Sequence, residues 1–291
     1  MIQAGVNMSA WISGLLVVGE FCLLVALELR RPLRRAVEPK VRHVARNLAV
    51  SVSSAFAVQL AESPVCQPLS RIMERRKLGF LKRLSLPGMV EVALAVLLMD
   101  YTLYIWHRLM HRLELIWRFH LSHHVDLDLD ASTALRFHFS ELVLSVPWRA
   151  AQIAIIGVSP MAFSIWQTAL MLSILFHHSN VRLPVEFEKR LCRLIVTPRM
   201  HGVHHSVIRS EEESNFSSGL TLWDTLHGTL KLNVPQEEIT IGVPAYREGR
   251  DVGLPRVLIM PFREQRPTWQ LPGNGEPSRE PIPVPPHKLL V

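Results

Sequence analysis

The stretch AWISGLLVVGEFCLLVALEL, residues 10–29, is the first of several apolar blocks that decide the fold of this chain. Its 20 residues would form a helix about 30 Å long, close to the hydrocarbon thickness of a bilayer. No basic segment precedes the block, whereas Arg30, Arg31, Arg34 and Arg35 follow it, so it lacks the pattern of a cleaved signal peptide. We predict a retained transmembrane helix.

Four further apolar blocks follow along the chain. Residues 48–60 form the second and residues 88–106 the third, and residues 142–176 hold the fourth and fifth, which are split by GVSP at residues 157–160. Glycine followed by Ser-Pro ends one helix and starts another. The last two blocks are short for full crossings, so a hairpin of partial depth and two complete spans both remain open. The sequence predicts an all-α, multi-pass protein with about four to five membrane helices.

The net charge of +7 is carried by basic runs beside the apolar blocks, at residues 30–46 and 71–83. Lys and Arg at these places would meet anionic lipid headgroups. The charge is accompanied by no nucleic-acid recognition motif and no phosphate-binding glycine loop, so we expect no nucleic acid or nucleotide partner. Cys22, Cys66 and Cys192 show no paired spacing, which argues against disulfides and against a thiolate metal site.

Three regions are predicted along the chain. Residues 1–87 would be membrane-anchoring helices with basic flanks, residues 88–232 a catalytic domain that holds nearly all of the histidine, and residues 233–291 a C-terminal extension. From about residue 262 the extension is rich in proline, a composition typical of disorder.

Histidine is the residue type that indicates chemistry in this sequence. Twelve of the 14 histidines lie between His107 and His227, and eight of these form the motifs HRLMH at residues 107–111, HLSHH at 120–124 and HGVHH at 201–205. The i, i+4 spacing of the first motif would place both rings on one helical face. Eight imidazoles exceed the needs of one tetrahedral zinc and suit two metal ions, although imidazole binds Fe, Zn and Cu alike.

Two well-known metal sites are excluded at identifiable positions. An HExxH zinc protease has a glutamate after its first histidine, whereas Arg108 stands there in this chain. The Glu and Glu-x-x-His spacing of the soluble di-iron carboxylate bundles is absent. What remains is a pair of metals held mainly by histidine in a membrane protein.

The three motifs, in this order and at these intervals, resemble the histidine boxes of the fatty acid hydroxylase and sterol desaturase superfamily. The resemblance covers roughly residues 100–229 and includes TALRFHFSE, LFHHSNVRLP, TPRMHGVHHS and NFSSGLTLWDTLHGT. It implies two iron ions, O2 as co-substrate and electrons supplied from outside the chain. The implied ligands are His107, His111, His120, His123, His124, His178, His201, His204 and His205. His138 is a further candidate, although Phe139 replaces the proline that commonly follows this histidine in the family.

A ligating imidazole donates its other N–H to a carboxylate or carbonyl, so polar residues in the matched segments are candidates to hold the rings. Asp100 is the strongest, because it lies two helical turns before His107 and an acid inside a membrane helix is costly. The others are Glu141, Asn180, Asn215 and Asp224. The sequence leaves open whether His177 is a ligand, and His43 and His287, outside the matched segments, are expected to be solvated.

Lipid C–H bonds carry no acidic proton, so acid–base groups cannot break them, whereas a metal oxidant can. We therefore expect a membrane-bound non-haem di-iron oxygenase that hydroxylates or desaturates a lipid. A separate donor, such as a ferredoxin or a cytochrome b5 with its reductase, would supply the electrons. The alternative is a histidine-rich metal-binding or metal-transport membrane protein without redox turnover, which would have His and acidic residues along the middle of several helices.

The basic run at residues 30–46 favours a cytoplasmic location for the end of the first helix. Counting spans from there places the three histidine motifs on the cytoplasmic face, in a helical cap that carries the di-metal site. The basic residues at 71–83 fall on the opposite face in this count and so disagree with the positive-inside rule.

Overall fold

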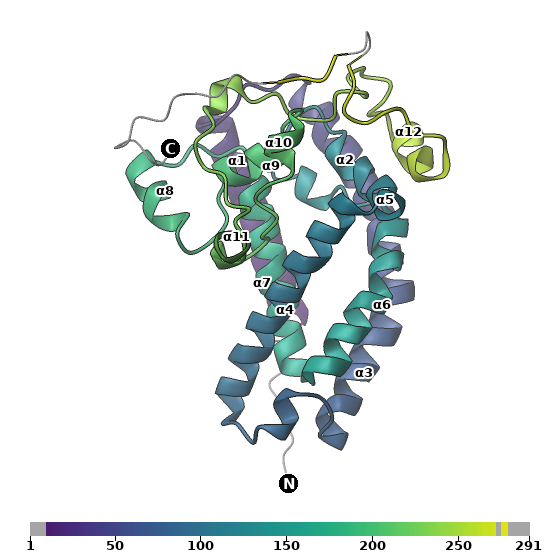
Figure 1. Cartoon of the computed structure of the whole chain (residues 1–291), viewed down its shortest axis with the longest axis vertical. Coiled ribbons are helices and arrows are strands. Elements are labelled where there is room, and N and C mark those ends of the chain that lie inside the picture. Colours follow the sequence, from purple (N-terminus) through teal and green to yellow (C-terminus); the bar gives the residue numbers. More distant parts are fainter. Residues whose placement is uncertain (1–9, 272–274, 279–291) are drawn as a thin grey trace.

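The computed structural model describes residues 10–271 and 275–278, and these residues are helical apart from loops and isolated β-bridges. Figure 1 shows a bundle of long helices with short helices gathered at one end, which we call the cap. Five helical segments are long and apolar enough to cross a membrane. The prediction of an all-α chain with four to five membrane helices is therefore confirmed.

The second span is much longer than its apolar block predicts. α1 (Ala10–Arg30) runs towards the cap, and the chain then returns through α2 (Lys40–Ala57), the π-helical turn η1 (Val58–Glu62) and α3 (Ser63–Arg76) without a break. At 1.5 Å per residue this segment is about 55 Å long. The block at residues 48–60 is only its middle, because the Arg, Met and Glu residues that follow are good helix formers and continue the helix beyond the apolar stretch.

α4 and α5 meet at a single extended residue. α4 (Gly88–Arg112) begins after Pro87 and runs back to the cap, where Leu113 adopts φ −100° and ψ 108° before α5 (Glu114–His124) begins. This residue breaks the helix two residues after the first histidine motif. The second motif can therefore fold back towards the first.

α6 (Phe139–Ile156) and α7 (Pro160–His178) form a hairpin that reaches the end of the bundle opposite the cap. Gly157 ends α6 at φ 85°, and the Ser159 hydroxyl accepts a hydrogen bond from the Ala162 N–H at the start of α7. The turn touches the loop after α3 so closely that a Cβ on Gly79 would lie 2.2 Å from the Gly157 Cα. The hairpin thus reaches as far from the cap as the end of α3, which favours two complete spans over a hairpin of partial depth.

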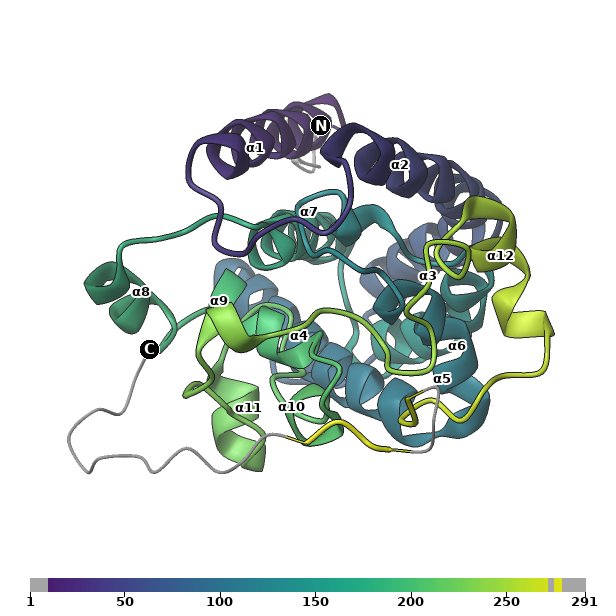
Figure 2. The same ribbon diagram turned by 90° about the horizontal axis from the view of Figure 1, so that it is seen from above.

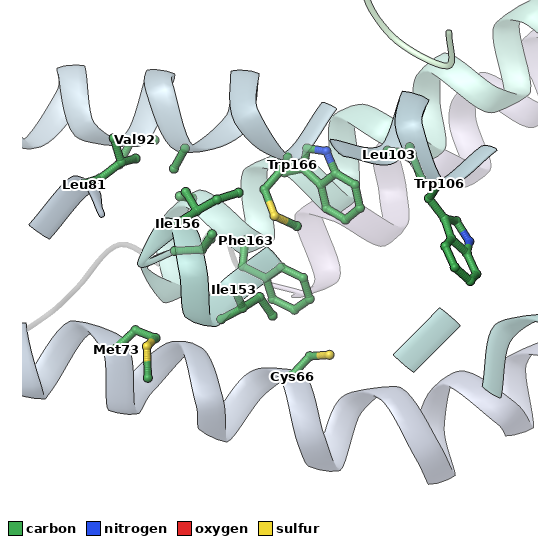
Figure 3. Close-up of a cluster of buried hydrophobic side chains, with 14 of the residues drawn as sticks. Cys66, Met73, Leu81, Val92, Leu103, Trp106, Ile153, Ile156, Phe163 and Trp166 are labelled. Carbon is green, nitrogen blue, oxygen red and sulfur yellow. The ribbon is translucent and has the colours of Figure 1, made fainter. Parts of the chain in front are cut away.

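The centre of the bundle is a buried apolar cluster contributed by α3, α4, α6, α7 and the short helix η2 (Leu81–Arg83). Figure 3 shows Cys66 and Met73 of α3 facing Ile153 and Ile156 of α6, with Phe163 and Trp166 of α7 beyond them. Between helices in lipid the stabilising contribution is close van der Waals packing, since lipid tails are as apolar as the side chains. The cluster therefore sets the positions of the helix ends that enter the cap.

The cap consists of short helices joined by loops, and Figure 2 shows it from above. Its α-helices are α5, α8 (Val185–Leu191), α9 (Pro198–His204), α10 (Arg209–Glu212), α11 (Leu222–His227) and α12 (Leu254–Ile259), and its 3-10 turns are η3 (Thr133–Leu135), η4 (Gln236–Glu238) and η5 (Met260–Phe262).

Residues 262–271, which the sequence predicts to be disordered, pack against α5. The rings of Phe262 and Phe119 lie 6.3 Å apart between centroids, and those of Trp269 and Trp117 lie 6.1 Å apart. These aromatic contacts outweigh the proline-rich composition here, and the partly buried Trp269 contributes the larger apolar contact. Residues 272–274 and 279–291 of the predicted disordered tail lie outside the described residues.

Candidate metal centre

The nine histidines that the family resemblance implies as ligands lie in two adjacent groups. Within each group the ring nitrogens lie within 4.8 Å of one another. The five-histidine cluster comprises His107, His111, His120, His124 and His204, and the four-histidine cluster comprises His123, His178, His201 and His205. All but His111, which is partly buried, are buried.

Helical periodicity explains how each HxxHH motif divides between the two clusters. In the second motif, His120 and His124 are four residues apart on one face of α5 and belong to the five-histidine cluster, whereas His123 points to the other cluster. In the third motif the pairing is reversed, because His201 and His205 belong to the four-histidine cluster and His204 to the five-histidine cluster. Each motif thus ties the two clusters together.

The remaining histidines of the two clusters come from the ends of two membrane helices. His107 and His111 occupy the last turns of α4, and His178 is the final residue of α7. The two clusters touch where the rings of His124 and His205 stack, with centroids 4.3 Å apart and planes 11° apart. Nine imidazoles from four helices are therefore gathered at the cap end of the bundle.

The rings of the five-histidine cluster are held by oxygen atoms behind them. His107 Nδ1–H donates to the Phe216 carbonyl at 2.7 Å, and His204 Nδ1–H donates to the Ser214 carbonyl at 2.8 Å. His120 Nδ1 lies 3.0 Å from a carboxylate oxygen of Glu141, one of the predicted supporting residues. His111 Nδ1 is in contact with the Glu212 carboxylate.

The four-histidine cluster has far less support of this kind. His178 Nδ1–H donates to the Ile174 carbonyl at 2.9 Å. Within the part of the chain that the structure describes, Nδ1 of His123, His201 and His205 has no hydrogen-bond partner. The orientation of these three rings is therefore set by packing rather than by hydrogen bonds.

The nitrogens that face inward fit a cation. Because His178 Nδ1 carries the proton given to Ile174, its Nε2 is a bare lone pair, yet it lies 3.0 Å from Nε2 of both His123 and His201. Burial, and then the neighbouring histidines, hold the pKa values of His124 and His205 well below the usual range, so these rings are neutral. Neutral imidazoles with converging lone pairs are the donor set that imidazole-binding metals require.

The structure brings two other candidate histidines into neither cluster. His138 caps α6, where its Nδ1 accepts from the Ser140 N–H and its Nε2–H donates to the Leu258 carbonyl at 3.1 Å. Both of its ring nitrogens are thus engaged elsewhere. The His177 ring packs 4.1 Å from His201 between centroids, but His177 is not part of either group.

Asp100, Asn215 and Asp224 contact no ligand ring but hold the loop that supplies the two carbonyl acceptors. Asp100 accepts from the Trp223 indole N–H at 2.7 Å and from the Leu220 N–H at 3.1 Å. Asp224 accepts from the Phe216 N–H at 2.9 Å, and Asn215 adopts φ 52° within the loop. The prediction that Asp100 would bind a ligand ring directly is therefore wrong, because its carboxylate faces this loop instead.

The Asn180 side chain is hydrogen-bonded to the α1–α2 loop and not to a ring of either cluster. Its side chain accepts from the Arg34 N–H at 2.8 Å and donates to the Arg34 carbonyl at 2.9 Å, which fixes the α1–α2 loop against the end of α7. Glu212, in contrast, contacts His111 of the five-histidine cluster, and the sequence does not predict this contact. It lies in the run SEEESN, where the sequence gives no signal to distinguish one glutamate from its neighbours.

A third group of possible metal-binding side chains, Glu38, His43 and Asp126, is an ion network. His43 is buried with its ring nitrogens 2.8 Å from Asp130 and 2.9 Å from Asp126, so the expectation that it is solvated is wrong. Arg46 pairs with both Glu38 and Asp126. Although burial alone would raise the pKa of Asp126, Arg136, His43 and Arg46 hold it well below its usual range. The network fixes the loop after the second motif to α2.

Comparison with known proteins agrees with this geometry. Residues 92–229 match the family model described as fatty acid hydroxylase. The ornithine lipid hydroxylase OlsE of Rhizobium tropici is 31% identical over 162 residues, which cover 54% of this chain and 46% of that protein.

Two animal proteins are also similar to part of this chain. Human alkylglycerol monooxygenase is 29% identical over 51% of this chain and 32% of its own length. Mouse cholesterol 25-hydroxylase is 28% identical over 48% of this chain and 47% of its own length. The alignments thus span less than half of each relative. No solved structure matches the chain.

Proposed function

Because residues 92–229 form a domain of the fatty acid hydroxylase family, we propose that the chain is a membrane-bound non-haem di-iron oxygenase that hydroxylates a lipid. The observation that carries the proposal is the convergence of nine imidazoles, eight of them from buried residues, in two touching clusters. The five-histidine cluster would hold one iron and the four-histidine cluster the other, with O2 as co-substrate. Desaturation of the lipid uses the same oxidant and is the alternative outcome.

Bound iron would supply the oxidising power that breaks an unactivated C–H bond. The protein's own residues hold and shield it. Glu141 and the carbonyls of Phe216 and Ser214 orient rings of the five-histidine cluster, which fixes the nitrogen that faces the metal. Burial of these rings excludes water, so a strong oxidant would meet substrate rather than solvent.

A metal-binding or metal-transport protein without redox turnover remains the competing function. Transport predicts metal-binding residues along the middle of several helices. Here the ligand candidates lie at the cap ends of α4 and α7 and in the cap itself, far from the opposite end of the bundle. This arrangement favours a fixed site at one membrane face.

The chain is an integral membrane protein, and we propose that its substrate is a membrane lipid. Each of the relatives is named for a lipid, namely an ornithine lipid, an alkylglycerol and cholesterol. The lipid used by this chain would be identified by comparing the lipids of cells with and without the gene. A hydroxylated species that is present only with the gene is the expected result.

For orientation, we propose that the cap faces the cytoplasm, where reduced electron donors are available. The seven Lys and Arg residues at positions 30–46 support this orientation, since they lie at the cap end of α1. The six at positions 71–83 lie at the opposite end and argue against it. A reporter fused after Thr229 should be active on the cytoplasmic side, and activity on the other side would reverse the orientation.

The function is tested by metal analysis of protein purified without oxygen. We expect two irons per chain, and lipid hydroxylation only when O2 and an external donor are both supplied. Ferredoxin and a cytochrome b5 with its reductase are the donors to try. One tightly held zinc with no iron would sink the di-iron proposal, and turnover with NADPH and O2 alone would contradict the need for a donor.

A further inference from the structure

An aromatic path connects the five-histidine cluster to the surface of the cap. The Trp117 ring is buried, with 7% of the residue exposed, and its centroid lies 4.9 Å from that of His111 and 5.3 Å from that of His124. On its other side Trp117 stacks with Trp269, with centroids 6.1 Å apart and planes 23° apart. Trp269 is only half-buried, so the path ends at solvent.

The path exists because residues 263–268 of the C-terminal segment form hydrogen bonds with α5. The Trp117 indole N–H donates to the Thr268 hydroxyl, the Gln265 amide donates to the Arg118 carbonyl, and Arg118 donates to the Arg263 carbonyl. These contacts hold residues 263–269 in place over the helix. They belong to the segment that the sequence predicts to be disordered, and none of them is needed to hold a metal.

The surface around Trp269 carries several arginines. The Arg209 guanidinium lies 5.9 Å from the centroid of the Trp269 ring, and Arg263 is exposed in the neighbouring loop. Arg209 pairs with the exposed Glu213, whereas Arg118 and Arg263 have no carboxylate within ion-pair distance among the described residues. A partner that bears carboxylates beside its redox centre would match this surface.

We propose that Trp117 and Trp269 form the electron-entry route to the five-histidine cluster, and that an acidic one-electron carrier protein docks on the arginines around Trp269. This inference rests on the proposed function. Hydroxylation places one oxygen atom of O2 in the substrate and releases the other as water, which consumes two electrons and two protons. The carrier is oxidised once for each electron delivered, and the protons come from solvent.

The physical reason for the route is the steep fall of electron tunnelling with distance. Trp269, Trp117 and the rings of His111 and His124 form a chain of neighbouring aromatic rings from the cap surface to the cluster, with centroids 4.9–6.1 Å apart. Neither ring has to change its oxidation state, because each only couples donor to acceptor. The path reaches His111 and His124, so the electrons enter at the five-histidine cluster first.

The tryptophan step is tested by the rate at which reduced plant-type ferredoxin passes electrons to the iron-loaded protein. The rate is measured by stopped-flow absorbance without O2, so no turnover is involved. With Trp269→Leu we expect the limiting rate at saturating ferredoxin to fall about tenfold, while the ferredoxin concentration at half-saturation stays unchanged. Trp11→Leu, in the exposed part of α1, is the matched control and should transfer electrons at the wild-type rate.

Trp117→Phe extends the test, since it keeps an aromatic ring in a buried position. It should slow transfer less than Trp269→Leu, and the optical spectrum of the bound iron will show whether the site is intact. Reduced methyl viologen, a small reductant, should reduce all of these variants equally. Wild-type rates with ferredoxin in both tryptophan variants would mean that electrons enter elsewhere, and the route would be wrong.

The docking surface is tested by charge reversal. Arg209→Glu with Arg263→Glu should lower the second-order rate constant with ferredoxin about tenfold and weaken its dependence on salt. Arg193→Glu changes an exposed residue that follows α8 in the sequence, and Figure 2 shows α8 on the other side of the cap from α5, so this variant should have no effect. If Arg193→Glu lowered the rate constant as much as the double variant does, the proposed docking site would be wrong. A wild-type protein that binds no iron would overturn the proposed function itself, which separates the two failures.

Discussion

The five-histidine and four-histidine clusters touch each other, yet their rings are held in different ways. Behind the first stand two carboxylates, Glu141 and Glu212, and the two carbonyls of the 214–216 loop. Behind the second there is one carbonyl, that of Ile174. The outward nitrogens of its other three rings have no partner among the described residues.

This difference has a chemical consequence. A carboxylate that accepts from a ligating imidazole increases the basicity of the ligand and fixes its ring, and losing such a partner typically lowers metal affinity 10- to 100-fold. The five-histidine cluster should therefore bind its metal more tightly. The four-histidine cluster should bind more weakly and adjust more easily when a ligand changes.

The largest expected effect comes from removing one ring from either cluster. His124→Ala in the five-histidine cluster and His205→Ala in the other should each reduce lipid hydroxylation to background, because the proposed reaction uses both metals. Iron content should fall from two per chain to about one in each variant. The hydroxylation activity and the iron content are both measured on protein that still inserts in the membrane. Wild-type activity in either variant would remove that cluster from the site.

The next effect tests the carboxylates behind the five-histidine cluster. Glu141→Gln keeps the shape of the side chain but removes its charge from His120, and it should lower the affinity of this cluster for iron 10- to 100-fold. Competition with a chelator, followed by absorbance, measures the change. Glu213→Gln, an exposed neighbour of Glu212 that pairs with Arg209, is the control and should change affinity little. Equal affinity in Glu141→Gln and wild type would show that the carboxylate is not coupled to the metal.

The sequence predicts the histidines of the two clusters better than the residues that support them. The three boxes supply eight of the nine rings, because a helix turns i and i+4 onto one face, and the family resemblance adds His178. Glu141 is likewise predictable from its matched segment. Glu212 is not, because only the fold of α10 decides which glutamate of a run turns inward. His43 is missed because its partners Asp126 and Asp130 lie more than 80 residues away in sequence, and only the fold brings them together.

A third prediction concerns the order in which the metals leave. A chelator should remove iron from the wild-type protein in two phases, with the four-histidine cluster emptied about ten times faster. The phases are assigned with His205→Ala, which should keep iron only in the five-histidine cluster and show only the slow phase. A single phase in the wild type, or a fast phase in His205→Ala, would contradict the inequality of the two clusters.

The smallest expected effect concerns the support that the four-histidine cluster receives from the α1–α2 loop. Asn180 lies two residues after His178 and makes two hydrogen bonds to the backbone of Arg34. Asn180→Ala leaves these partly buried groups unpaired, which should cost about 1–3 kcal/mol of stability. The end of α7 loosens, so the fast phase of iron release should quicken a few-fold while the slow phase stays unchanged. Gln270→Ala, an exposed change, should alter neither phase. If Asn180→Ala quickened both phases alike, the loop would support the whole cap, and the asymmetry between the clusters would rest on Glu141 and Glu212 alone.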